Sequence, residues 1–161
     1  MIFMPQYWMG RDTIYPDEFT QKIKSNGEVT VFVVDKLLGM FAADTGIILT
    51  DCASGWRPAQ VNCATSNAAE HSRHITAEAC DVRDTPNRDL ARWCCKNQGR
   101  LAELGLWVER FEWTSKEQSD GSWLHWVHVQ RVPPLSKRRF YIPSMSPAMA
   151  PRLPEQDQYN C

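Results

Sequence analysis

The chain has only four histidines, and they fall into two short clusters. One cluster, "EHSRHITAEACDVRD", runs from Glu70 to Asp84, and the other, "WLHWVHVQ", runs from Trp123 to Gln130. Zinc in proteins is bound by neutral imidazole nitrogen and carboxylate oxygen as well as by thiolate. The clusters therefore predict a metal site, and the alternative is two polar patches on the surface.

Within the clusters, three residues are the best candidates for metal ligands, namely His74, Asp81 and His128. His128 lies in an apolar segment, where an unpaired imidazole would be costly. Three protein ligands leave one coordination position for water, which is the pattern of a catalytic rather than a structural zinc. The alternative is structural, because a single His–Asp pair, or two histidines in an aromatic strand, often belongs to a satisfied core. His71 is expected to be a solvated loop residue.

A hydrolytic site also needs a proton carrier and a group that stabilises developing negative charge. His125, three residues before His128, is the candidate proton carrier. Residues three apart on a straight strand point to opposite faces, so this role requires a bend or bulge before His128. Arg57, in the loop "SGWRP", is a candidate for holding a carboxylate or an oxyanion, with a structural salt bridge as the alternative. Asn62 is expected to brace this loop or contact a substrate.

Composition bounds the class of protein. The 161 residues fit one domain, with 43% hydrophobic and 23% charged residues. A formal net charge of -1 predicts no general attraction to nucleic acid, and no apolar run approaches the roughly 20 residues that cross a bilayer. The first residues lack the pattern of a signal peptide. The six cysteines contain no CxxC spacing, so reduced thiols are expected rather than metal ligands.

Hydrophobic periodicity and turn residues predict helices that are segregated from strands. The segment 30–44 is ambiguous, because its first half is β-branched, but its apolar residues recur at helical spacing. A long polar loop over 53–74 is expected to be functional. The expected helices span 15–27, ended by Gly27, 30–44, closed by Gly46, and 85–105. The expected strands span 47–52, 77–84, 106–113 and 123–130, the last two joined by a polar turn.

This order of elements predicts the α+β class, with a small antiparallel sheet and helices packed on one side of it. A single domain is expected over residues 1–134. The proline-rich residues 135–161 are expected to form a surface tail or docking arm.

The motif series "SGWRP…N…SRHITAEACD…WVHVQ" resembles the zinc D-Ala-D-Ala carboxypeptidase superfamily. This superfamily includes phage endolysins that cut L-Ala-D-Glu bonds, bacterial D,D-dipeptidases and the hedgehog signalling domain. The resemblance covers about residues 47–134. Ala77 stands where glycine is usual in the family, and Trp56 replaces the tyrosine of the SGYR loop. The family pattern SxHxxGxAxD is matched by Ser72, His74, Ala79 and Asp81.

The resemblance implies a hedgehog-type fold and zinc bound by His74, Asp81 and His128. It implies that Arg57 contacts the substrate, and Asn62 and Ser72 are further candidates for substrate contacts. In many members the general base, three residues before the last ligand, is Glu or Asp, and here that position holds His125.

The expected function is a zinc peptidase that cleaves stem or cross-link peptides of peptidoglycan. The expected setting is a phage protein made in the host cytoplasm, which is released by a holin or carried in the virion, with a possible assembly partner for the tail. The alternative is a non-catalytic zinc-bearing binding module of the same fold. A thiol enzyme is a weaker third reading, because no cysteine lies in a recognisable nucleophile context.

Overall fold

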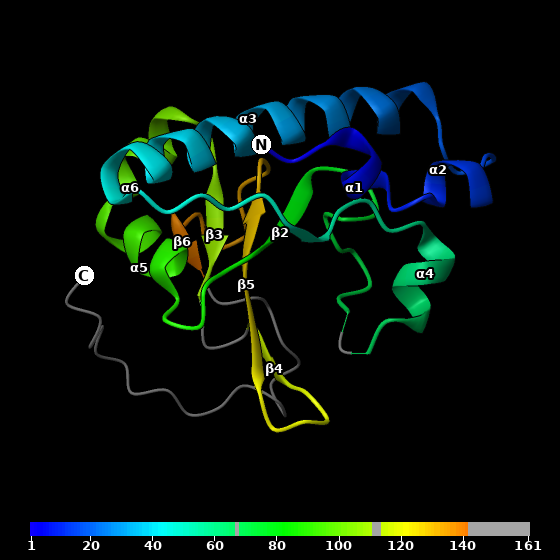
Figure 1. Cartoon of the computed structure of the whole chain (residues 1–161). Coiled ribbons are helices and arrows are strands. Elements are labelled where there is room, and N and C mark those ends of the chain that lie inside the picture. The colour runs from blue at the N-terminus through cyan, green and yellow to red at the C-terminus, as the bar shows by residue number, and fades with distance from the viewer. Residues whose placement is uncertain (67, 111–113, 142–161) are drawn as a thin grey trace.

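The computed structural model describes residues 1–66, 68–110 and 114–141, and its elements form a mixed α and β fold with one open sheet (Figure 1). The helices are α1 (Met4–Trp8), α2 (Arg11–Ile14), α3 (Gln21–Thr45), α4 (Ala59–Ala64), α5 (Asp89–Lys96) and α6 (Gln98–Glu103). The strands are β1 (Cys52–Ser54), β2 (Ala79–Arg83), β3 (Trp107–Glu109), β4 (Ser115–Glu117), β5 (Trp123–Gln130) and β6 (Phe140–Tyr141).

The strands are ordered β1-β2-β5-β3-β6, and β4 pairs with the outer part of β5. Every pair is antiparallel except β3 with β6, which is parallel. The described strands therefore pair as expected for an antiparallel sheet, except for the parallel pair β3 and β6 at one edge. Strand β6 comes from the segment expected to be the tail, and residues 142–161 lie outside the described part of the chain, so the domain boundary after residue 134 stays a prediction.

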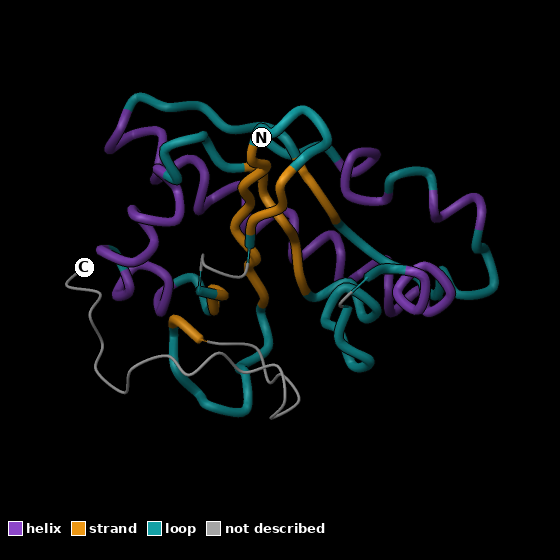
Figure 2. The backbone as a smooth tube through the Cα atoms, turned by 90° about the horizontal axis from the view of Figure 1, so that it is seen from below, coloured by secondary structure: helices purple, strands orange, loops and turns teal. Residues whose placement is uncertain are grey.

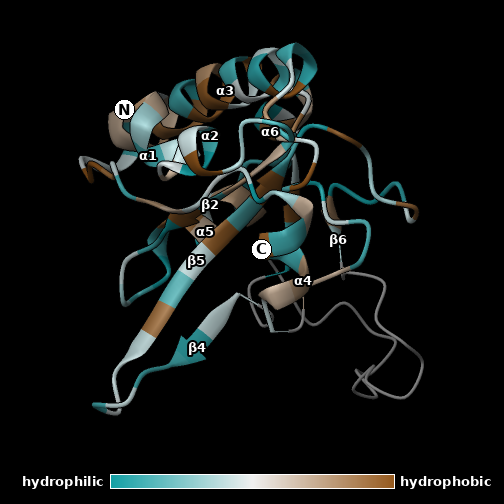
Figure 3. Ribbon diagram, turned by 90° about the vertical axis from the view of Figure 1, so that its right-hand side faces the viewer, coloured by the Kyte–Doolittle hydropathy of each residue, from teal (hydrophilic) through white to brown (hydrophobic). Residues whose placement is uncertain are grey.

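Side chains of the sheet alternate between two faces, and one face forms the core with the helices. Hydropathy alternates along β5 in the same way (Figure 3). Seen from below, the strands run through the middle of the molecule with helices on both flanks (Figure 2). The core face carries Cys80, Val82, Val108, Val127 and Val129, packed with apolar residues of α3, α5 and α6. The opposite face carries the polar residues described below.

The longest element, α3, replaces two expected helices. Its N-cap is Thr20, whose side chain accepts a hydrogen bond from the backbone N–H of Ile23, and it ends at Gly46 in the left-handed conformation, as expected. The expected stop at Gly27 is wrong, because the helix continues through it. A Cβ added at Gly27 would lie 2.0 Å from a ring carbon of Trp8, so this glycine serves the packing of α1 on α3.

Replacing Gly27 with alanine is expected to destabilise the fold by about 1–3 kcal/mol, although alanine favours helix, because the new methyl would overlap the Trp8 ring. Gly39 is the matched control in the same helix, since a Cβ there meets nothing within 4 Å. Gly39→Ala is expected to gain up to about 1 kcal/mol. Urea unfolding of both variants measures this, and equal effects would contradict the packing role.

Other helix and strand boundaries differ from the expected ones, because a local sequence pattern does not show which strands pair. The strand expected over 47–52 is β1, displaced toward the loop, and the expected loop 53–74 contains α4. The helix expected over 85–105 is interrupted at Asn97, which separates α5 from α6. The expected turn between the last two strands contains β4, and α1 and α2 were not expected. No helix in the described part of the chain is long and apolar enough to cross a membrane.

Candidate metal centre

The structure brings the three expected ligands together. One ligand atom from each of His74, Asp81 and His128 lies within 4.8 Å of the other two. His74 Nε2 lies 3.2 Å from His128 Nδ1 and 3.3 Å from Asp81 Oδ2, and His128 Nδ1 lies 2.7 Å from Asp81 Oδ1. His74 is fully buried, and the other two side chains are nearly so. Two nitrogens and a carboxylate thus converge on one point.

Asp81 and His128 converge because they are direct partners in neighbouring strands. The antiparallel register of β2 and β5 pairs Asp81 with His128, so both side chains lie on the same face of the sheet. Their neighbours Cys80, Val82, Val127 and Val129 point to the apolar core on the other face. The alternation of the two strands therefore places the two candidate ligands on the face opposite the helices.

His74 reaches the same point from the loop before β2. Its Nδ1 donates to the carbonyl of Gly55 at 2.6 Å, which leaves Nε2 directed at Asp81 and His128. A Cβ at Gly55 would lie 2.0 Å from the carbonyl oxygen of Tyr7, so only glycine allows the two backbones to approach this closely. A second imidazole nitrogen bonded to a carbonyl is the usual way in which a metal-binding histidine is oriented.

The turn between His74 and β2 keeps the conformation that glycine favours. Ala77 has φ 56°, in the left-handed region, and is fully buried. Its carbonyl oxygen accepts a hydrogen bond from Thr30 Oγ1 at 2.8 Å and lies 2.9 Å from the hydroxyl of Tyr7. These contacts from α1 and α3 hold the turn, so alanine at this position preserves the spacing of the first two ligands.

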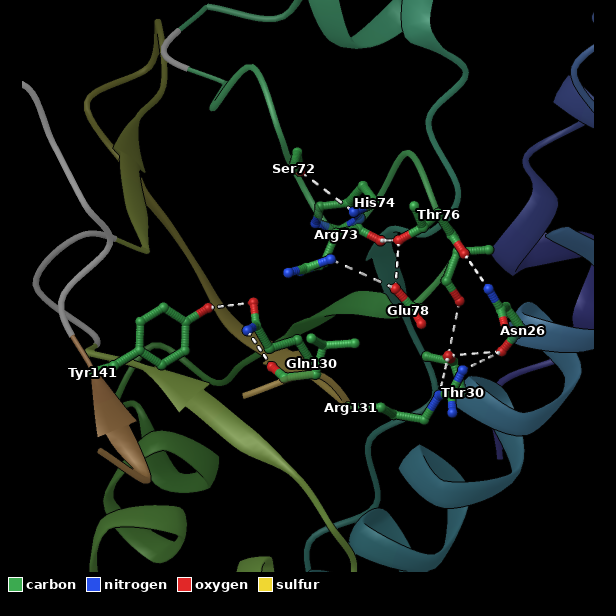
Figure 4. A network of polar contacts seen from close by, with 12 residues as sticks. Asn26, Thr30, Ser72, Arg73, His74, Thr76, Glu78, Gln130, Arg131 and Tyr141 are labelled. Atoms are coloured by element: carbon green, nitrogen blue, oxygen red, sulfur yellow. Dashed lines mark hydrogen bonds and ion pairs between the residues drawn. The ribbon is translucent and has the colours of Figure 1, made fainter. Parts of the chain in front are cut away.

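Further polar contacts fix the same turn from outside (Figure 4). Asn26 Nδ2 donates to the carbonyl of Thr76, and Thr76 Oγ1 donates to Glu78 Oε2 at 2.7 Å. Arg131 Nε donates to Thr30 Oγ1, which links the end of β5 to α3. Glu78 thus supports the turn and is not one of the three clustered ligands.

The charges of the cluster suit a cation. Burial alone would raise the pKa of Asp81, but the two imidazoles outweigh it and hold this pKa below its ordinary value. Burial lowers the pKa of His74, against the charge of Asp81. Burial also opposes a charged His128, but its hydrogen bond to Asp81 raises the pKa of His128. The ionised Asp81 and the neutral His74 are in the state that binds metal, and His128 must lose its proton to join them.

His125 does not join the cluster. Over residues 123–130 the strand pairs without a register shift, so the bend that its expected role requires is absent, and His125 lies on the opposite face from His128. Its Nδ1 forms a 2.8 Å hydrogen bond with Ser115 Oγ on β4. The expectation that His125 carries protons at the metal is therefore not supported by its position.

Arg57 lies beside the cluster. Its backbone N–H donates to the carbonyl of His74 at 3.1 Å. Burial lowers the pKa of its guanidinium, and the charges of Asp81 and Glu109 oppose this shift. Its Nε is buried and has no hydrogen-bond partner among the described residues. A buried, unsatisfied donor next to the cluster is suited to bind an anionic group.

The other two expected substrate residues have structural contacts. Asn62 is buried, and its Nδ2 donates to the carbonyl of Ala69 at 2.9 Å, which braces the loop after α4. Its Oδ1 is buried without a partner among the described residues. Ser72 Oγ accepts a hydrogen bond from the backbone N–H of His74 at 3.3 Å and so helps to place the first ligand.

Glu109 is the site residue that the sequence analysis missed. The register of β3 with β5 pairs Val108 with Val129, so Glu109, the next residue, faces His128 across the strands. Asp81, His128 and Glu109 thus form one row on the polar face of the sheet. Burial raises the pKa of Glu109 to about 7, with the charge of Asp81 adding to the shift and His128 and Arg57 opposing it. No short motif signals this residue, because its role depends on strand order.

The donor set fits zinc better than a hard cation. Two imidazole nitrogens and one carboxylate form a ligand set found in zinc sites, whereas Ca²⁺ and Mg²⁺ prefer sites built of oxygen. The free thiols of Cys52 and Cys80 are not among the clustered groups.

Comparisons with known proteins add no assignment to this geometry. No protein-family model, curated protein or solved structure matches the chain.

Proposed function

We propose that the protein is a zinc-dependent peptidase that cleaves stem or cross-link peptides of peptidoglycan. The observation that carries the proposal is the convergence of His74, Asp81 and His128 beside the unpartnered Nε of Arg57. The motif resemblance to the zinc D-Ala-D-Ala carboxypeptidase superfamily supplies the substrate class. A phage origin, with action as a lysis enzyme or within a virion, belongs to the same proposal.

The three clustered residues hold the zinc, which when bound supplies a Lewis acid and lowers the pKa of water. Arg57 binds a substrate carboxylate or the oxyanion that develops at the scissile carbonyl. Glu109 accepts a proton from the attacking water and passes it to the leaving amine. Its position in the row with Asp81 and His128 supports this role over His125, which lies on the other face.

Digestion of purified peptidoglycan tests the proposal. The zinc-loaded protein is expected to release muropeptides with one type of peptide bond cut, and mass spectrometry identifies that bond. Chelator should abolish the products and added zinc should restore them. A zinc-loaded protein that leaves peptidoglycan and isolated muropeptides intact would refute peptidase activity.

A second candidate is a zinc-bearing module without catalysis, and the position of His125 favours it. The residue three before the last ligand, where many family members carry the base, is turned away from the cluster. In this case zinc binds stoichiometrically and stabilises the fold, but no muropeptide is cut. Metal content and turnover, measured on the same preparation, separate the two candidates.

A further inference from the structure

Two thiols that the proposed function does not use lie side by side under the metal cluster. Cys52 on β1 and Cys80 on β2 are both free and buried, and their Sγ atoms are 3.6 Å apart. The strands are hydrogen-bonded neighbours, with a register shift between Cys52 and Ser54. The pair therefore spans two adjacent strands within the core.

The pair brackets the segment that builds the site. Residues 53–79 connect the two cysteines and carry Arg57 and His74. Cys80 directly precedes the ligand Asp81, and Cys52 lies three residues before Gly55, whose carbonyl oxygen orients His74. A covalent bond between these two sulfurs would close this segment at its base.

We propose that Cys52 and Cys80 form a disulfide under oxidising conditions, which closes the segment that carries His74 and Arg57. Each thiol loses one proton and one electron, and an S–S bond forms between the two sulfurs. The oxidant is a disulfide, such as oxidised glutathione or a protein disulfide, which takes up both electrons and both protons and becomes two thiols. The inference stands whether or not the protein hydrolyses peptidoglycan.

Geometry supports the bond. A disulfide needs sulfurs about 2.05 Å apart, so the two Sγ atoms must approach by about 1.5 Å. Cys52 lies opposite Val82 in the strand register, so Cys80 is its diagonal neighbour, and closing the gap requires a small shift of β1 as well as side-chain rotation. The other two free cysteines among the described residues differ, since Cys63 is exposed and Cys94 lies buried in α5.

The route to the bond passes through an opened state. Exchange requires contact between a thiolate and the oxidant, and both thiols are buried in the folded protein. β1 is a three-residue strand at the edge of the sheet, so its opening exposes the pair at low cost. Oxidation is therefore expected to be slow in the folded protein and fast during refolding.

Refolding the reduced full-length chain in a glutathione redox buffer tests the proposal. After free thiols are alkylated, mass spectrometry of a proteolytic digest is expected to find the peptides of Cys52 and Cys80 joined. Because closing a loop of this length restricts the unfolded chain, the Tm of the oxidised protein should rise by roughly 5–10 °C, and reduction should reverse the rise.

Matched variants keep the assignment specific. Cys63→Ser, at an exposed thiol, and Cys94→Ala, at a buried thiol, should both retain the shift in Tm. Cys52→Ala should lose it, while the Tm of the reduced form of this variant reports whether it still folds. If the unmodified chain, refolded in this buffer, lacks the 52–80 link, or if the link lowers its Tm, the proposal is overturned.

Discussion

Replacing His128 with alanine is expected to remove the bound zinc and to lower peptidoglycan cleavage by more than about 100-fold. Losing a residue that merely orients a metal ligand already costs 10–100-fold in affinity or activity, so losing a ligand should cost at least as much. The remaining pair, His74 and Asp81, offers only two donors. Metal analysis of the purified variant and product release from peptidoglycan measure the two effects.

His125→Ala is the matched control for this variant. It removes the same side chain from the same strand, but His125 lies on the opposite face and is bonded to Ser115. It should bind one zinc per chain and retain most activity. His71→Ala, at an exposed loop position, should behave like the unmodified protein. Full zinc content in a folded His128→Ala variant would contradict the ligand assignment.

Replacing Glu109 with glutamine is expected to lower turnover by about 10²–10⁴-fold while zinc stays bound, because the amide cannot accept the proton from water. Glutamine keeps the size of the side chain, so the row formed with His128 and Asp81 should persist. Turnover and zinc content are measured on the same sample. Glu103→Gln, at an exposed position of α6, should leave both unchanged.

Activity is expected to fall at low pH. A base must be ionised, so activity should fall as the pH drops through the pKa of Glu109, which burial raises to about 7. A bound cation favours the ionised form of Glu109, so in the zinc-loaded protein this fall in activity should occur at a lower pH. If the fall in activity at low pH disappears in His125→Ala and persists in Glu109→Gln, His125 and not Glu109 is the proton carrier.

The raised pKa of Glu109 also predicts how the stability of the metal-free protein depends on pH. Folding raises the pKa of Glu109 from 4.5 to about 7, so the folded state favours the neutral form. The contribution of this group to stability is complete below pH 4.5 and is lost as the pH rises through about 7. Glu109→Gln should remove this loss, which urea unfolding at several pH values measures.

The three candidate metal ligands could be predicted from sequence because two of them are close in sequence and the third lies in a clearly patterned strand. His74 and Asp81 are joined by one turn, and β2 and β5 are patterned clearly enough to place Asp81 and His128 on strands. Ala77 has the positive φ that glycine adopts most easily, and alanine is accommodated there because Tyr7 and Thr30 hold the turn.

Other features of the site and the fold depend on contacts between distant segments, which a sequence pattern does not show. Glu109 joins the site only because β3 pairs with β5 in a particular register. The spacing of His125 from His128 did not show whether the strand bends between them. The unbroken pairing of β5 shows that it does not, so His125 lies on the opposite face. Gly27 was expected to end a helix on local propensity, whereas the ring of Trp8, brought from another helix, is the reason for the glycine.

Zinc-edge X-ray absorption of the zinc-loaded protein tests directly whether His74, Asp81 and His128 bind zinc. We expect one zinc per chain, surrounded only by nitrogen and oxygen at about 2.0–2.2 Å, with the imidazole signal of two histidines. That signal should weaken in His128→Ala and persist in His125→Ala. A sulfur neighbour at about 2.3 Å, or no bound zinc in protein that is folded and metal-supplied, would contradict a centre built from His74, Asp81 and His128.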